Sequence, residues 1–297
     1  MPKKVSPTLV LVSLSALLII IFGGLWWRSI YSDPERVFKA MLDNSLRLTS
    51  VSKEVNQTGN GQEVRQFVDL EFGPEHRVLS RTLLTQLGDT PTTVETESIG
   101  TPTTDYVRYI DIDTEQTKPS GEPLDFSGVL GIWGSSDVDQ PDATTNGELY
   151  NESILGIVPF GVFDQAQRRE LLKLIEDENI YEVDYSAVSK EIQDGRPRYI
   201  YSLTVDAEAY IKLLKRFGEL HGLNHLSELD PAAYAGQERL PFVITADVWS
   251  RQLERIEYSA GDRIETFGSH NAVRGIELPA QVVSVDEIQS RLQALQQ

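Results

Sequence analysis

The stretch VRQFVDLEF, residues 64–72, decides the fold class because apolar and polar residues alternate along it. Successive side chains of a β-strand point to opposite faces of a sheet, so four apolar residues of this stretch share one face. They are Val64, Val68, Leu70 and Phe72. Three charged residues and Phe67 occupy the other face. The pattern predicts one strand of an antiparallel sheet that is covered on one face and faces water on the other.

Segments of the same kind surround this stretch in the first half of the chain. Strands are predicted at 51–58, 63–72, 76–87, 92–99 and 104–112. The intervals between them are too short for the crossover helices that parallel strands require, so the sheet is expected to be antiparallel. Before the first strand, Asp33 and Pro34 are typical of a helix start, which predicts a helix over residues 34–48.

The second half of the chain combines strands and helices in the same way. Asp164 and Asp206 are expected to cap two helices, and Ser284 opens a capping box before a last one. Asp194-Gly195 predicts a hairpin turn. Further strands are predicted near 180–191, 197–205, 241–250, 252–260, 263–269 and 275–283.

This order of elements indicates the α+β class, with a curved antiparallel sheet that forms a half-barrel and packs on helices. Residues 113–147 interrupt the pattern with prolines and glycines, and are expected to form a long loop held by apolar side chains that include Trp133. An alternative is two separate domains that divide within this loop.

The amino-terminal segment predicts a membrane anchor. Residues 9–27 form a run of nineteen without a charge, about the number that a helix needs to cross a bilayer. Lys3 and Lys4 precede the run, which places the amino terminus in the cytoplasm. The anchor is assigned to a set of apolar and aromatic residues, namely Leu9, Leu17, Ile20, Trp26 and Trp27.

The predicted organisation is a cytoplasmic tail at 1–8, an uncleaved transmembrane signal anchor at 9–27, and an extracytoplasmic half-barrel-like domain at 28–297. The predicted location is therefore the cell membrane, crossed once. The alternative is a cleaved signal peptide, although the run ends in Gly-Gly-Leu-Trp-Trp rather than in a small-x-small site.

Composition excludes several classes of function. The chain of 297 residues has 27 Lys and Arg against 45 Asp and Glu, a formal charge of −18, which would repel the phosphate backbone of a nucleic acid. It has no cysteine, so disulfides, thiolate metal sites, cysteine nucleophiles and the lipid-modified cysteine of bacterial lipoproteins are all excluded.

The sequence predicts neither an enzyme nor a metal or cofactor site. His221 and His225 have the i, i+4 spacing of zinc ligands, but position 222 is glycine rather than the glutamate of a metalloprotease motif. Asp111-Ile112-Asp113 begins like a calcium loop and lacks the glycine and terminal glutamate that complete one. No phosphate-binding or nucleophile motif is present, so no catalytic residue is assigned.

The carboxy-terminal part of the chain resembles a known family. The segments, in order, are LPF at 240–242, ADVW at 246–249, LERIEY at 253–258, TFG at 266–268 and IELP at 276–279. This order resembles the LolA/LppX-like superfamily of bacterial lipoprotein carriers, which includes LppX, LprA, LprF and LprG. The resemblance implies a half-barrel closed by helices, with lipid or lipoprotein acyl chains held between the sheet and the helices.

The resemblance also implies a ligand lining on the covered face of the sheet. The expected lining consists of Val64, Val68, Leu70, Phe72, Trp133, Val248 and Trp249. We therefore expect a membrane-anchored extracytoplasmic protein that binds a lipid, a lipoprotein or another apolar ligand in a cavity between sheet and helices. The alternative is a non-catalytic scaffold of the cell envelope, which would have this fold and a protein partner. Nucleic acid is not an expected partner.

Overall fold

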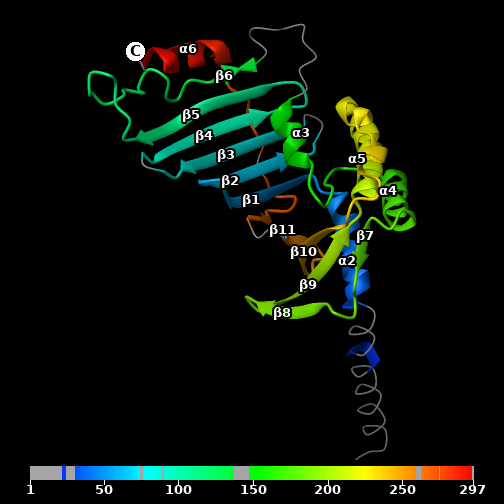
Figure 1. The fold of residues 1–297 in the computed structure, drawn as a ribbon. Helices are drawn as coiled ribbons and strands as arrows, with labels where there is room; N and C mark the ends of the chain where they lie inside the picture. The colour runs from blue at the N-terminus through cyan, green and yellow to red at the C-terminus, as the bar shows by residue number, and fades with distance from the viewer. Residues whose placement is uncertain are drawn as a thin grey trace, which may run out of the picture.

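The computed structural model describes residues 22–24, 31–73, 76–88, 90–136, 147–258, 262–273 and 275–295. The described strands form one sheet of thirteen (Figure 1). Its order is β13-β6-β5-β4-β3-β2-β1-β12-β11-β10-β9-β7, with β8 paired to β9. Both halves of the chain contribute strands to this one sheet.

The first five strands form an antiparallel meander. They are β1 (Ser50–Gly59), β2 (Gln62–Glu71), β3 (Arg77–Gln86), β4 (Thr92–Gly100) and β5 (Asp105–Thr114). Each lies within two residues of its predicted position. The alternation that predicts β2 corresponds to its burial, since Val68 and Leu70 are buried whereas Arg65 is exposed.

The second half of the chain extends the sheet beyond β1. Its strands are β7 (Tyr181–Val183), β8 (Ser189–Gln193), β9 (Arg196–Val205), β10 (Leu240–Asp247), β11 (Leu253–Tyr258) and β12 (Arg263–Gly268). The predicted hairpin at Asp194-Gly195 is confirmed, because both residues have the positive φ values, 52° and 76°, that a two-residue turn between β8 and β9 requires.

The helices begin where the sequence places caps. They are α2 (Pro34–Ser45), α3 (Glu148–Ile154), α4 (Gln165–Asp177), α5 (Ala207–His221) and α6 (Val285–Leu295), with 3-10 turns η3 (Asn224–Glu228) and η4 (Pro231–Tyr234). The side chains of Asp33, Asp164 and Asp206 each accept a hydrogen bond from the first turn of a helix. The sequence analysis missed α3, because a helix of seven residues shows too little periodicity to be recognised.

The two faces of the sheet are covered by different parts of the chain. On one face, which we call the inner face, α3 packs on β2 to β5, while α2 packs on β10 and on α4 (Figure 1). The core lies here and includes Phe72, Leu213, Phe217 and Ile244, all nearly inaccessible to water. On the outer face, the segment 269–282 runs back across the sheet, and Ile276 is hydrogen-bonded there to Glu71 and Arg77.

This return across the outer face corrects the predicted fold class. The predicted strand at 275–283 is reduced to β13 (Val283–Ser284), which pairs in parallel with β6 (Gly134–Ser135). The sheet is therefore mixed rather than antiparallel. It is also open rather than closed into a half-barrel, since β13 and β7 end it without pairing with each other. No hairpin connects β13 to its neighbour β6. The direction of β13 is therefore set by the long segment that leads into it from the outer face.

The predicted membrane-spanning helix also requires correction. Of the expected span at 9–27, the structure describes only Phe22–Gly24, and the anchor residues Leu9, Leu17, Ile20, Trp26 and Trp27 lie outside the described residues. In the described part of the chain, no helix has the length and apolar character needed to cross a bilayer. The longest described helix, α5, has 15 residues and is amphipathic. The transmembrane element of the fold class and the predicted single-pass location, which both require such a helix, therefore have none among the described residues.

Candidate functional site

The candidate site is a half-open groove between α2, α4 and β7. Its volume is about 520 Å³, within the range of small-molecule sites. Apolar and aromatic side chains form its floor, and charged side chains form its rim. The floor consists of Phe38, Leu42, Leu172, Ile175, Tyr181, Val183 and Tyr185.

Each element contributes to the floor through one of its faces. Phe38 and Leu42 lie one turn apart on the buried face of α2, and Leu172 and Ile175 lie at i, i+3 on α4. The helices lie antiparallel along the groove. Lys39 reaches Glu176 near the end of α4, whereas Asp43, further along α2, reaches Arg168 near its start.

Aromatic packing holds the floor in place. The ring of Phe38 contacts those of Tyr181, Tyr185 and Tyr201, with centroids 6.0, 6.2 and 5.2 Å apart. The hydroxyl of Tyr181 donates to the main-chain oxygen of Ile157 at 2.5 Å. Burial raises the pKa of Tyr185 to about 12, and nearby Glu35 adds to this effect, so the ring is uncharged at neutral pH. The floor therefore presents neutral aromatic surface to a ligand.

An ion pair joins the two helices across the rim. Nζ of Lys39 lies 3.1 Å from Oε1 of Glu35 and 3.1 Å from Oε1 of Glu176. Hydrogen bonds to these two carboxylates raise the pKa of Lys39. Exposed pairs of this kind contribute only about 0–1 kcal/mol to stability, so the apolar floor contributes more than the rim to holding α2 against α4.

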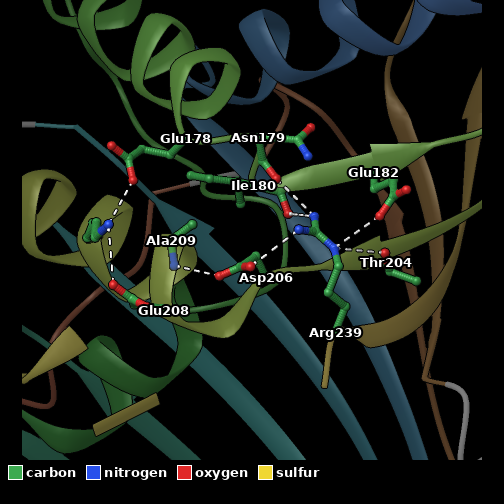
Figure 2. Close-up of polar contacts among 10 residues, drawn as sticks. Glu178, Asn179, Ile180, Glu182, Thr204, Asp206, Glu208, Ala209 and Arg239 are labelled. Atoms are coloured by element: carbon green, nitrogen blue, oxygen red, sulfur yellow. Dashed lines mark hydrogen bonds and ion pairs between the residues drawn. The ribbon is translucent and has the colours of Figure 1, made fainter. Parts of the chain in front are cut away.

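Arg239 fixes the corner at which α4 leads into β7 (Figure 2). Its Nη2 donates to the main-chain oxygens of Asn179 and Ile180, both at 2.9 Å. Its Nη1 donates to Asp206 at 3.3 Å, and its Nε donates to the Thr204 hydroxyl at 3.0 Å. Asn179 and the neighbouring β7 line the groove. Arg239, which directly precedes β10 and contacts Thr204 on β9, therefore holds one end of the groove in position.

A second contact stabilises the same corner from α5. Lys212 lies between Glu178, just beyond α4, and Glu208, one turn earlier on α5, at 2.8 and 3.5 Å (Figure 2). It links the end of α4 to the start of α5. The wall of the groove formed by α4 is thus held at its carboxy-terminal end by two basic side chains.

The predicted lining residues lie elsewhere. Val68, Leu70, Phe72 and Val248 come together in the buried core, and Val64 lies half-buried further along β2. Their side chains pack against other protein side chains of the inner face. Their role in holding a ligand stays a prediction.

The two predicted tryptophans are not brought together with the other lining residues. Trp249 is 52% exposed in the turn after β10. Trp133 lies on the outer face, with the guanidinium of Arg108 4.6 Å from the centre of its ring. The structure therefore gathers four of the seven predicted residues into one core and leaves the tryptophans apart.

The groove was not predicted, although the sequence carries a signal for it. The apolar stripes of α2 and α4 are visible in the sequence, and both helices were predicted. A stripe does not show which part of it a neighbouring element covers. Which apolar side chains of these two stripes stay open to solvent depends on how far apart α2, α4 and β7 lie.

A second hollow, of about 600 Å³, lies on the outer face beneath the segment 269–279. It contains Glu97, which accepts hydrogen bonds from Arg81 at 2.9 Å and from Arg108 at 3.1 Å. Burial alone would raise the pKa of Glu97, but the two guanidinium groups lower it below its ordinary value. Of the residues that the structure describes, the one cation that lines this hollow, Arg108, is thus already paired with Glu97, and the lining has a smaller apolar part than that of the groove.

His221 packs among aromatic rings at the end of α5. Its ring contacts those of Phe163, Phe217 and His76, with centroids 5.0–5.2 Å apart. Burial, with a smaller contribution from neighbouring His76, lowers the pKa of His221 to about 4. Among the residues that the structure describes, no group of three or more His, Cys, Asp or Glu side chains is arranged to hold a metal ion.

Comparison with known proteins gives likeness only at the level of solved structures. No family model and no curated protein sequence matches the chain. The structure of LprF from Mycobacterium bovis is similar over 84% of this chain and 97% of its own, with 15% identity and a TM-score of 0.42. That of the Mycobacterium tuberculosis lipoprotein LppX is similar over 83% and 100%, with 16% identity and a TM-score of 0.39. LprF and LppX belong to the superfamily that the carboxy-terminal segments resemble, and the groove has to be interpreted from its own residues.

Proposed function

We propose that the protein binds one lipid-like molecule in the groove between α2, α4 and β7, without a catalytic step. The observation that supports this is the combination of a half-open apolar floor with a charged rim. Sites for small molecules have this composition, with a mainly apolar lining and a few polar groups that orient the ligand. The groove borders the edge of the sheet, so the site still lies between sheet and helices.

The size of the groove is adequate for useful affinity. Each methylene group removed from water contributes about 0.8 kcal/mol, so about ten methylenes contribute roughly 8 kcal/mol before the entropic cost of association. A net affinity in the micromolar to millimolar range follows. The space directly between the main sheet and α3 is occupied by side chains such as Val68, Val78 and Tyr150, all at most 1% exposed.

The test uses the full-length chain and Nile red, a neutral apolar dye that fluoresces on leaving water. We expect saturable binding that an excess of a twelve-carbon alcohol reverses by competition. Leu172→Gln, which places an amide on the floor, should weaken dye binding at least fivefold. Ile192→Gln is the matched control, because Ile192 is 71% exposed on β8, away from the groove.

Two results would overturn the proposal. One is dye binding that Leu172→Gln leaves unchanged, which would place the dye elsewhere. The other is crosslinking in cells that captures a single protein partner through Leu172 while the purified chain binds neither dye nor alcohol. The second result would favour the scaffold that the sequence analysis keeps as its alternative.

A further inference from the structure

The rim of the groove carries three acidic and three basic side chains. They differ in how far protein partners leave them available to bind a ligand. The acidic ones are Glu35, Glu176 and Glu182. Glu35 and Glu176 are both engaged by Lys39, and Glu182 lies 3.4 Å from Nε of Arg239. All three carboxylates and one of the three cations therefore already have partners.

The positive charges of the remaining cations, Arg169 and Lys173, are paired weakly or not at all with acidic side chains. The side chain of Arg169 has no ion pair or hydrogen bond with any residue that the structure describes. Lys173 has one contact of 3.9 Å, with Asp177, and its side chain is 76% exposed. The two residues lie at i, i+4 on α4, so they share one face of the helix, one turn apart.

These cations lie along the α4 side of the groove. Because α2 and α4 are antiparallel, Arg169 lies near the carboxy-terminal end of α2, whereas Glu35 and Glu182 lie at the opposite end with Tyr185. Lys173 lies one turn further along α4, beside Leu172 and between Arg169 and Glu176. The groove is thus polar along its length, with Arg169 and Lys173 along the α4 side and neutral aromatic surface at the end near Tyr185.

The charge of the whole chain makes this pair of cations unusual. A protein with a formal charge of −18 repels anions over most of its surface. Arg169, and Lys173 with its single 3.9 Å contact to Asp177, oppose that field locally beside the apolar floor. Guanidinium and ammonium groups bind carboxylate and phosphate oxygens by charge-assisted hydrogen bonds.

Resting on the proposed function, we propose that the groove selects single-chain amphiphiles with an anionic head group, a carboxylate or a phosphate. The head group binds Arg169 and Lys173, and the chain extends over Leu172 and Phe38 toward Tyr185. A single chain fits the volume of the groove, and its charged head stays at the open rim, in contact with water.

The experiment compares head groups on one chain length. The full-length chain is titrated by calorimetry with dodecanoate, dodecyl phosphate, dodecanol and dodecyltrimethylammonium, each below its micelle concentration, and with inorganic phosphate alone. The two anionic amphiphiles should bind at least tenfold more tightly than the cationic one, and high salt should reduce this preference. Inorganic phosphate should bind at least a hundredfold more weakly than dodecyl phosphate.

Variants locate the selectivity. Arg169→Gln with Lys173→Gln should remove the tenfold preference while dodecanol binds as before. Lys190→Gln with Arg196→Gln makes the same charge change on the exposed β8–β9 hairpin, and should leave the preference intact.

The outcomes separate this inference from the proposed function. Equal binding of all four amphiphiles, unchanged in the double variant, overturns the anionic preference and leaves a groove for apolar molecules. Inorganic phosphate binding as tightly as dodecyl phosphate overturns the lipid-like ligand in favour of a free anion. If no amphiphile binds, both the inference and the proposed function fail.

Discussion

The imidazole rings of His76 and His221 lie in contact, with centroids 5.0 Å apart and ring planes inclined at 59°. Nδ1 of His76 is 3.1 Å from the hydroxyl of Tyr150 on α3. Burial raises the pKa of Tyr150 and lowers that of His76, so the phenol keeps its proton and the imidazole stays neutral near pH 7. This contact joins the start of β3, α3 and the end of α5, and a positive charge on either ring would disturb it.

The first prediction concerns stability in acid. The pKa of His221 is about 4 in the folded chain and about 6.5 when unfolded, so between these values the unfolded chain binds a proton that the native chain does not. The free energy of unfolding should therefore fall as the pH is lowered from 6.5 to 4, by up to roughly 3 kcal/mol from this group. Urea unfolding of the wild type and of His221→Gln across this range measures the difference. Equal slopes in both proteins would show that His221 does not titrate in this way.

The second prediction concerns the corner that Arg239 holds. Arg239→Ala removes a donor from the main-chain oxygens of Asn179 and Ile180, of which the second still accepts from the main-chain N–H of Asp206. We expect it to lower the free energy of unfolding by about 1–3 kcal/mol. Arg36→Ala, which removes an exposed arginine from α2, should change it by less than about 0.5 kcal/mol. Denaturant unfolding measures both variants. Arg239→Ala should also weaken dye binding in the groove, and an unaffected groove would show that its corner does not depend on this side chain.

The third prediction concerns the contact between α3 and the sheet. A Cβ atom on Gly100 would lie 2.8 Å from a methyl group of Val78 and 2.9 Å from the main-chain nitrogen of Tyr150. Gly100→Ala should therefore force α3 away from β4 and cost about 1–3 kcal/mol. Gly59→Ala, at the end of β1, meets no atom within 4 Å and should be nearly neutral. Thermal melts of both variants test the pair, and similar melting temperatures would contradict the close approach.

The fourth prediction concerns the buried carboxylate of the outer face. Glu97→Gln keeps the size of the side chain but removes the charge that pairs with Arg81 and Arg108, and we expect it to cost about 1–3 kcal/mol at pH 7. Because the folded pKa of Glu97 is below its ordinary value, the stabilisation by its ionised form should be present above pH 4.5 and lost as the pH falls through the folded pKa. The matched control is Glu54→Gln, whose pair with Arg65 is more exposed. A cost of Glu97→Gln that does not decrease in acid would contradict this account.

The strands of the first half could be predicted from sequence because each carries its own signal. Alternation along 63–72 reports which side chains face the core, and short intervals between the strands force hairpins. The signals for helix starts are equally local, because Asp33, Asp164 and Asp206 each cap the helical turn that directly follows. These features depend on residues only a few positions apart.

The features that were missed or wrong depend on residues far apart in the chain. β13 lies parallel to β6, although about 150 residues separate them, because the segment 269–282 crosses the outer face before it reaches the edge of the sheet. The strand residues themselves, Gly134-Ser135 and Val283-Ser284, are too few to show any periodicity. The candidate groove was missed for the same reason, since its walls come from three separate elements.

The sequence by itself determined that the chain builds an antiparallel meander. It also determined where most of the helices begin, and that the chain lacks cysteine chemistry and a basic composition. Local periodicity, capping and composition carry that information. Only the tertiary structure decided that the predicted lining residue Leu70 packs into the core, and that Phe38, Leu172 and Tyr185 border an open groove beside two free cations. An apolar side chain is buried or left open according to the distance and angle between the elements around it, which packing of the whole chain sets and no local pattern records.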